Sequence, residues 1–286
     1  MQRGNQNTRE IRRCPHAHEG IGTPVSDRHI YDLEQPRTTD MPVIDSHKPG
    51  YYYALHRRHS DTYNPDQGVR SSASGMIVCM EHAGTHIDAL CHQAEHLTLC
   101  GGVSVADVEK NGGFRKHGIE EVPPIVGPAV LLDVPRLLGI EKLDLGYLIS
   151  LDEIQACVRD QNLTIEPGST VLVRTGNALR WNDEAAYLAG PGVSAAASEW
   201  LADQGVIAVG ADTMAWDVIG RYDEEYKCEL PGHLILLARR GVYIIENMDL
   251  EALASDRQWS FEFVCLPLKF VGATGSPVRP IAITGS

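Results

Sequence analysis

The sequence predicts a single α/β domain with a mixed β-sheet core flanked by helices. Three observations favour this fold class. Short runs of β-branched and aliphatic residues, bounded by glycine and proline, recur along the chain and are typical of strands. Segments with helical periodicity alternate with them, as in α/β proteins. No repeat, low-complexity linker or shift in composition divides the chain, which favours one domain over two.

The N-terminal segment is polar and lacks apolar periodicity. We therefore expect residues 1–30 to form a flexible arm and residues 31–286 to form the domain. Within the domain, seven β-branched runs are expected to be strands. They lie at 76–81, 129–134, 170–175, 206–209, 242–246, 261–266 and 278–284.

Three segments are expected to be helices. Ser150 and Glu153 have the spacing of a capping box, which predicts a helix that begins at Ser150. A second helix is expected at 194–205 and a third at 233–240, because a glycine stands at or directly after the end of each segment and suits a left-handed terminal residue.

Composition narrows the class of protein. The 286 residues are 43% hydrophobic, enough for a sizeable core. The 25 Lys and Arg residues against 38 Asp and Glu give a net charge of −13, which argues against nucleic acid or an anionic membrane as a partner. No apolar run approaches the roughly 20 residues of a membrane span, and residues 1–24 are too polar for a signal peptide. We expect a cytoplasmic protein whose seven scattered cysteines are reduced.

One segment concentrates metal-ligating side chains. His82, Gly84, His86 and Asp88 have equal parity, so on an extended chain the three ligand types would share one face, with a glycine leaving room between them. Two imidazoles and a carboxylate suit Zn(II), Mn(II) or Fe(II) and leave positions open for water. The alternative interpretation is a polar strand with hydrogen-bonded histidines.

The motif His82-x-Gly-Thr-His86-x-Asp88, followed four residues later by His92, resembles the signature of the metal-dependent cyclase family. This family includes bacterial kynurenine formamidases and isatin hydrolases, and the resemblance covers about residues 30–284. It implies a fold of the swivelling β/β/α type. It also implies hydrolysis of a non-peptide amide, a cyclic amide such as a lactam or an isatin-like ring, or a lactone.

The same resemblance assigns roles to individual residues. His92 matches the catalytic histidine of the family, and the cofactor would be one or two divalent ions, Zn or Mn. N-formylkynurenine formamidase proper is an alternative, although Leu90 and Gln93 stand where short formamidases commonly have Pro and Phe. The implied metal ligands, or residues directly beside the metal, are His82, His86, Asp88, His233 and Glu246.

The resemblance further implies a small-molecule substrate pocket and a homo-oligomer, a dimer or larger. The tyrosine run at 51–53 and the polar arm also favour an oligomer, because an arm without a core gains order by covering another chain. The run could equally be an ordinary strand. The candidate substrate-binding residues are Tyr51, Tyr53, Asp212, Thr213 and Trp216.

The expected mechanism is attack of metal-activated water on a carbonyl, with His92 carrying the proton to the leaving nitrogen or oxygen. Two alternatives come from other classes. Two histidines and a carboxylate are also the ligand composition of Fe(II) oxygenases and lyases. A catalytically silent metal-binding protein could use the same residues.

Overall fold

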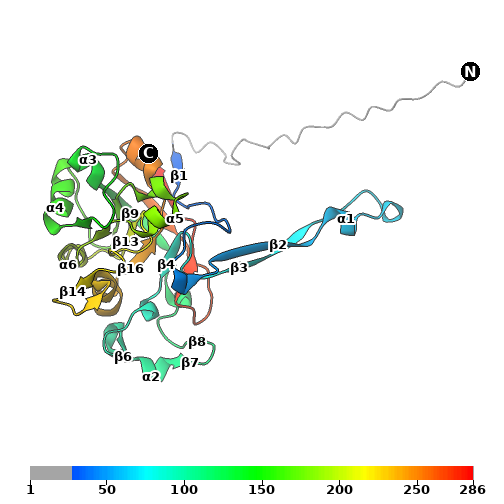
Figure 1. The fold of residues 1–286 in the computed structure, drawn as a ribbon, viewed down its shortest axis with the longest axis horizontal. Coiled ribbons are helices and arrows are strands. Elements are labelled where there is room, and N and C mark those ends of the chain that lie inside the picture. Colours follow the sequence, from blue (N-terminus) through cyan, green and yellow to red (C-terminus); the bar gives the residue numbers. More distant parts are fainter. Residues whose placement is uncertain (1–27, 286) are drawn as a thin grey trace, which may run out of the picture.

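The computed structural model describes residues 28–285, which form a mixed sheet of nine strands at their centre (Figure 1). The middle of the sheet is parallel and consists of β9 (Ile125–Asp133), β11 (Thr170–Arg174), β13 (Ala208–Ala211) and β16 (Tyr243–Glu246). On one side, β17 (Ser260–Cys265), β19 (Ile281–Thr284) and β1 (His29–Asp32) follow in antiparallel order. On the other side lie antiparallel β4 (His86–Asp88) and β18 (Gly275–Pro277). The expected α/β class is confirmed.

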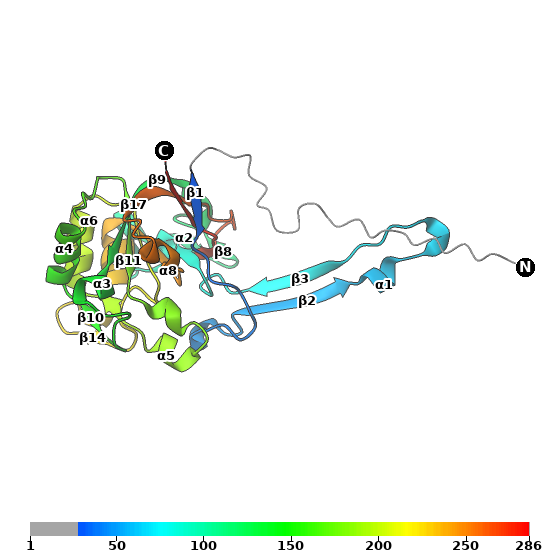
Figure 2. The same ribbon diagram turned by 90° about the horizontal axis from the view of Figure 1, so that it is seen from above.

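The central strands contribute to cores on both faces of the sheet, because successive residues of a strand point to opposite faces. Val171 and Val173 pack with helices α4 (Leu151–Asp160) and α6 (Ala195–Asp203), whereas Leu172 packs in the opposite core. Figure 2 shows α4 and α6 together on one side of β11. Burial on both faces explains the continuous β-branched runs in the sequence.

The remaining elements are short. The other α-helices are α1 (His59–Thr62), α2 (Val105–Val108), α3 (Val134–Leu138), α5 (Glu184–Leu188), α7 (Pro231–His233) and α8 (Glu251–Ser255). The small two-stranded sheets pair β2 (Tyr51–Arg57) with β3 (Ser74–Cys79), β5 (Thr98–Leu99) with β6 (Val103–Ser104), β7 (Glu109–Lys110) with β8 (Gly113–Phe114), β10 (Leu148–Ile149) with β12 (Gly192–Val193), and β14 (Tyr222–Asp223) with β15 (Cys228–Glu229).

The expected helices are present with one difference in type. The capping box of α4 is formed: the Ser150 hydroxyl accepts from the Glu153 N–H, and Glu153 accepts from the Ser150 N–H at 2.8 Å. The third helix begins as α7 but continues as a π-helix, η7 (Leu234–Arg240). It ends, as expected, at a left-handed glycine, Gly241, whose N–H bonds five residues back.

The segment that carries the histidine motif is not extended throughout. Only His86–Asp88 form a strand, and residues 81–85 form a turn in which Gly84 has a φ of +62°. The Arg37 guanidinium donates to the carbonyls of Ala83 and Thr85 and so stabilises this turn. The expectation of one extended face from residue 82 to 88 is therefore wrong, and His82 reaches the site from the turn.

A long hairpin of β2 and β3 projects away from the body of the molecule (Figures 1 and 2). The expected strand at 76–81 belongs to this hairpin and not to the central sheet. The expected arm lies almost wholly outside the described residues, while β1 begins at His29. Within residues 28–285, no helix is both long and apolar enough to cross a membrane, and the cysteines at 79, 91, 100, 157, 228 and 265 are free.

Candidate metal centre

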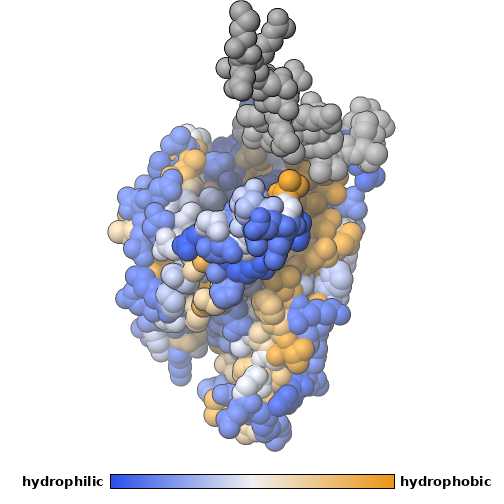
Figure 3. Space-filling model, turned by 90° about the vertical axis from the view of Figure 1, so that its right-hand side faces the viewer, coloured by the Kyte–Doolittle hydropathy of each residue, from blue (hydrophilic) through white to orange (hydrophobic). Residues whose placement is uncertain are grey.

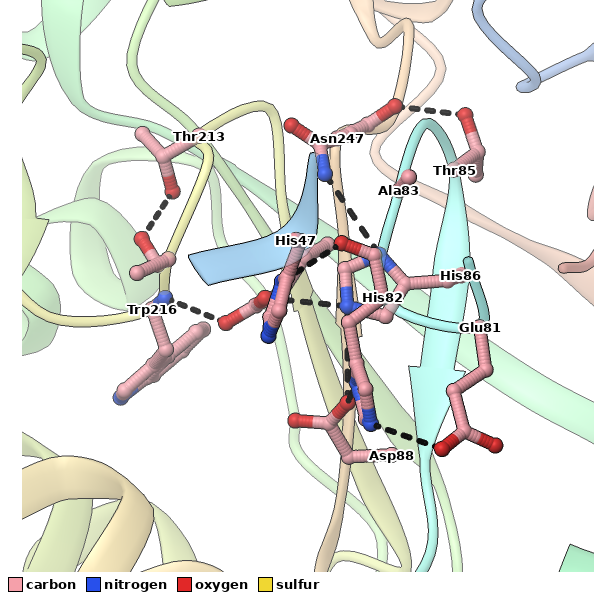
Figure 4. Close-up of polar contacts among 12 residues, drawn as sticks. His47, Glu81, His82, Ala83, Thr85, His86, Asp88, Thr213, Trp216 and Asn247 are labelled. Atoms are coloured by element: carbon pink, nitrogen blue, oxygen red, sulfur yellow. Dashed lines mark hydrogen bonds and ion pairs between the residues drawn. The ribbon is translucent and has the colours of Figure 1, made fainter. Parts of the chain in front are cut away.

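Three separate stretches of the chain bring the candidate ligands together. β4 supplies His86 and Asp88, and its antiparallel neighbour β16 places Glu246 directly opposite His86. The turn before β4 supplies His82, and the end of α7 supplies His233. All five side chains are buried. Figure 4 shows His82, His86 and Asp88 pointing toward one another at this edge of the sheet.

The five side chains form two ligand groups that share Asp88. The first group is His82, His86 and Asp88, and the second is Asp88, His233 and Glu246, with the possible ligand atoms of each group within 4.8 Å of one another. Asp88 Oδ1 lies 2.8 Å from His82 Nδ1 and 3.4 Å from His86 Nε2. Asp88 Oδ2 is buried and has no hydrogen-bond partner among the described residues. A buried carboxylate oxygen without a partner is costly unless a cation meets it.

Contacts outside the cluster direct two of the histidines, His86 and His233. His86 Nδ1 lies 2.8 Å from the Gly84 carbonyl, and His233 Nδ1 lies 2.7 Å from Asp217 Oδ2. Carbonyl and carboxylate oxygens only accept, so each Nδ1 carries a proton. In the neutral ring the lone pair is then on Nε2, which faces Glu246 at 3.3 Å in His86 and 3.1 Å in His233. Lone pairs aimed at carboxylates fit a bound cation.

The pKa values of the cluster also fit a bound cation. Burial opposes charge on His86, yet its contacts with Asp88 and Glu246 raise its pKa to about 10. Burial likewise opposes charge on Glu246, but facing His233 and His86 lower its pKa to about 2. The carboxylates are therefore stable only with positive charge between them, and a divalent cation would provide that charge in place of protons.

His92 lies at the edge of the cluster and is not part of either ligand group. It ends the 3₁₀ turn η3 (Leu90–His92), and its ring stacks on His82 with centroids 4.0 Å apart. Burial lowers its pKa to about 3, reinforced by the positive charges of His82 and His233 and opposed by Asp88. A neutral imidazole beside the ligands is placed to accept a proton.

An apolar cleft adjoins the turn that carries His82. Its volume is about 750 Å³, and it lies between the base of the β2–β3 hairpin and residues 268–277. Glu81 stands on its wall, one residue before His82. The other lining residues are Arg37, Tyr51, Ile77, Cys79, Met80, Leu268, Phe270, Ala273 and Pro277.

The family model named Cyclase matches residues 31–218, a span that contains His82, His86, Asp88 and His92. The chain belongs to the Cyclase family. Kynurenine formamidase of Bordetella petrii is 28% identical to this Cyclase-family chain over 258 residues, covering 89% of this chain and 97% of that protein. Cyclase-like protein 3 of Oryza sativa subsp. japonica is 30% identical over 224 residues, covering 76% of this chain and 67% of that protein.

Solved structures of the same fold agree with this membership. The crystal structure of a novel cyclase gives a TM-score of 0.79 at 29% identity and covers 90% of this chain and 87% of its own. Isatin hydrolase A from Ralstonia solanacearum gives a TM-score of 0.69 at 22% identity, covering 90% of this chain and 92% of its own. Hence the Cyclase fold extends over nearly the whole described chain.

The candidate substrate residues separate into two places in this Cyclase-family structure. Tyr51 lines the cleft, and the Tyr53 ring lies farther out on the hairpin, against Gly75. Asp212 and Thr213 are instead in the interior: Asp212 accepts from the Thr175 and Gly176 N–H groups, and Thr213 donates to a neighbouring carbonyl. These two side chains are occupied in local bonds and do not line the cleft.

Trp216 contacts the centre through its backbone. Its N–H donates to Glu246 Oε1 at 2.7 Å, while its ring is fully buried and donates to Ser198. The ring is therefore not part of the cleft wall. The Trp216 backbone instead helps to hold Glu246 in place.

Three polar residues that the sequence did not single out support the ligands. Asp217 accepts from the N–H groups of Gly232 and His233 in addition to the His233 ring. Asn247 donates to the Gly84 carbonyl that also binds His86, and Tyr187 donates to Asn247. Of these three residues, the sequence gives a local indication only for Asn247, a polar residue directly after the buried strand β16.

Proposed function

We propose that this Cyclase-family chain is a metal-dependent hydrolase that cleaves a non-peptide amide, a cyclic amide or a lactone. The observation that carries the proposal is the buried cluster of three histidines around two carboxylates, with the Asp88 Oδ2 atom left without a partner among the described residues. The names of its relatives, kynurenine formamidase and isatin hydrolase, support an amide or cyclic amide substrate. The apolar cleft beside Glu81 supports a small, largely apolar molecule.

The ligand groups support two divalent ions, Zn or Mn, that share Asp88. His82 and His86 would hold one ion, and His233 and Glu246 would hold the other. When bound, such ions polarise a carbonyl and lower the pKa of a water to about 7. Glu246→Ala should then lower the bound metal from about two ions to about one per chain. Unchanged stoichiometry in this variant would contradict the assignment.

His92 is the proposed proton carrier. Its ring lies against His82 without joining either ligand group, and it stays neutral near pH 7 because its pKa is about 3. Its neutral ring has a lone pair that can take the proton of the attacking water and return it to the leaving nitrogen or oxygen, and the nearby charges of Asp88 and Glu246, which raise its pKa, favour the protonated form. A formamide such as N-formylkynurenine would follow the same route, which keeps formamidase activity as the second candidate.

The decisive experiment is a turnover screen of the zinc- or manganese-loaded protein with N-formylkynurenine, isatin, lactams and lactones. His92→Ala should retain its metal while the rate falls about 10²- to 10⁴-fold. His96→Asn, at a left-handed loop position outside the ligand groups, is the control and should leave the rate unchanged. No turnover of any substrate by the loaded protein, or loss of metal in His92→Ala, would overturn the proposal.

We also propose a cytoplasmic homodimer that requires neither nucleic acid nor a membrane, in keeping with the net charge of −13. The β2–β3 hairpin supports a second copy of the chain as partner. Cross-strand pairs such as Tyr53 with Ile77 and Tyr52 with Val78 alternate in side, so both faces of this two-stranded ribbon are apolar. Figure 3 views the molecule from the side on which the hairpin projects and shows hydrophobic residues on the surface behind it.

Charge is also compatible with this partner. Residues 51–79 carry three arginines and two aspartates, a net of +1, which leaves −14 on the rest of the chain (22 − 36). An isolated two-stranded ribbon is marginally stable in water. A ribbon with two apolar faces and little net charge is not repelled by the acidic body of another copy, and twofold symmetry would cover both ribbons.

A further inference from the structure

Two residues outside both ligand groups form a hydrogen-bond chain to the outer nitrogen of His82. Glu81 Oε1 lies 2.6 Å from the Thr274 hydroxyl, which lies 2.7 Å from His82 Nε2. The second Glu81 oxygen accepts from the N–H groups of Thr274 and Gly275 at 3.1 and 3.3 Å. These hydrogen bonds link the turn before β4 to the residues at the start of β18.

The positions of the hydrogens follow from the chemistry of the three groups. A carboxylate only accepts, so the single hydroxyl hydrogen of Thr274 points to Glu81. The Thr274 oxygen can then only accept from the ring, and His82 must carry a proton on Nε2. The other nitrogen, Nδ1, faces Asp88 Oδ1 at 2.8 Å. Without metal this nitrogen also faces an acceptor and donates to it, and a metal ion would take the place of that hydrogen.

We propose that Glu81 and Thr274 are positioning residues that keep the His82 proton on Nε2 and so reserve Nδ1 for a metal ion. This inference rests on the metal centre of the proposed function. His86 and His233 are directed by a carbonyl and a carboxylate, which can only accept. Threonine can donate or accept, so the hydroxyl of Thr274 alone would allow either tautomer of His82. Glu81 removes that freedom.

Close packing holds the ring in this orientation. A Cβ on Gly275 would lie 2.7 Å from His82 Cε1 and 3.1 Å from its Nδ1, so only glycine allows the ring to approach the backbone here. Gly275 is also paired with Asp88 across β18 and β4. The ring, the hydroxyl and the carboxylate are thus set by one stretch of backbone that adjoins the ligand strand.

Glu81→Gln tests the proposal because it should reverse the direction of the hydrogen bonds that run from His82 through Thr274 to residue 81. The amide oxygen would keep accepting from the two backbone N–H groups, which leaves the NH₂ group to donate to Thr274. The threonine hydrogen would then turn to His82 Nε2, which would have to accept it, and the ring would keep a proton only on Nδ1, opposite Asp88. In metal-free protein at about pH 8, ¹⁵N-histidine NMR should show a proton on His82 Nε2 in the wild type and none in Glu81→Gln.

Zinc affinity gives the second readout, measured by competition with a chromophoric chelator. Glu81→Gln should weaken binding about 10- to 100-fold, the usual effect of removing a partner that orients a ligand. Thr274→Val, which removes the hydroxyl, should weaken binding less, and Thr274→Ser should restore it to the wild-type value. The valine and serine variants test the chain even if Glu81→Gln folds poorly.

Glu120→Gln is the matched control. Glu120 accepts from the Gly272 N–H at 2.9 Å and so holds the same loop, two residues before Thr274, without contacting a histidine. It should change neither readout. The proposal is overturned if Glu81→Gln keeps the Nε2 proton and wild-type affinity, or if Glu120→Gln loses as much affinity. The NMR readout needs no metal, so a wild-type protein that binds no zinc would contradict the proposed function alone.

Discussion

Acceptor groups beside the ligand histidines limit where a histidine proton can be. Asp217 is the strongest example, because its two oxygens accept from three N–H groups of Gly232 and His233. It holds both the start of the helical segment and the ring that it carries. An amide at this position has only one accepting oxygen, and its NH₂ group would face a donor.

Asp217→Asn should therefore release His233 from its orientation. We expect the affinity for the ion bound by His233 and Glu246 to fall about 10- to 100-fold, measured by calorimetric titration of zinc into metal-free protein. Asp223→Asn is the control, since Asp223 accepts from two backbone N–H groups in an exposed turn away from the centre. Equal zinc binding by Asp217→Asn and wild type would show that the carboxylate does not direct His233.

The sequence predicted the centre only in part, and the reason is distance along the chain. His82, His86 and Asp88 lie within seven residues, so their spacing could be read directly. His233 and Glu246 were reached only through the family resemblance. Thr274 contacts His82 across 192 positions, and no local pattern indicates such a contact.

A polar residue in a family motif can also stabilise the interior by binding backbone N–H groups. Asp212 was a candidate for the substrate pocket, but burial raises its pKa to about 6 although bonds from Thr175 oppose the shift. It caps the backbone after β11 at residues 175 and 176. Spacing cannot distinguish a carboxylate that meets a ligand from one that meets backbone N–H groups.

Among the elements, α4 offers a test of local sequence rules. Tyr147 and Ser150 both donate to Glu153 at its start. Burial opposes ionisation of Glu153, yet these hydrogen bonds lower its pKa below the ordinary 4.5. A carboxylate with a depressed folded pKa stabilises the protein fully above its unfolded pKa, and this contribution is lost as the pH falls through the folded pKa.

Glu153→Gln should accordingly cost about 1 kcal/mol near pH 7, the usual value of a cap. The difference in the free energy of unfolding between the variant and the wild type should shrink as the pH is lowered below 4.5. Urea unfolding at several pH values measures it. A difference that is constant with pH would mean that the charge of Glu153 does not stabilise α4.

The β2–β3 hairpin is the element whose position was predicted least well from the sequence. Its strand at 76–81 was expected, but nothing indicated that it would stand apart from the sheet, because both of its faces are apolar as in a buried strand. The exposed fractions of Ile77 and Val78 are 65% and 49%. Such exposure is costly unless another surface covers it.

Lysine at these two positions should separate the proposed dimer. Ile77→Lys and Val78→Lys, one on each face, cost little in a single chain because both sites are exposed, but they would bury a charge in the dimer. Analytical ultracentrifugation at micromolar concentration should show two chains for the wild type and one for each variant. Val126→Lys, an exposed site on β9, is the control. A one-chain mass for the wild type would refute the dimer.

For the whole molecule, metal binding and folding should be linked. The two ligand groups join β4, β16, the turn before β4 and the end of α7, and this arrangement does not exist in the unfolded chain. Zinc at about 100 times its dissociation constant would add about 2.7 kcal/mol to the free energy of unfolding.

Chelation should consequently lower the melting temperature by about 5 to 10 °C, and zinc should restore it. Differential scanning calorimetry of the metal-free and reloaded protein measures the shift. Asp88→Ala removes the shared ligand and should respond to neither treatment. A melting temperature that chelation leaves unchanged would show that the centre does not stabilise the fold.

At this scale the sequence predicted the fold class but not the order of the strands. Most expected strands overlap the observed ones, because β-branched runs depend on local composition. Their order depends on which distant segments pair: β17 lies beside β9, and β4 lies between β16 and β18. These pairings join residues more than 100 positions apart and follow from packing in three dimensions.

The pairing of β1 with β19 has a consequence for the connectivity of the fold. His29 lies opposite Thr284 at the outer edge of the sheet, so the two ends of the described part of the chain are neighbours. A short linker could join them, and the chain could be opened at the hairpin tip, where Gly68 has open space around it. Such a circular permutant would keep every strand of the nine-stranded sheet and both halves of the metal centre, with new termini on the ribbon.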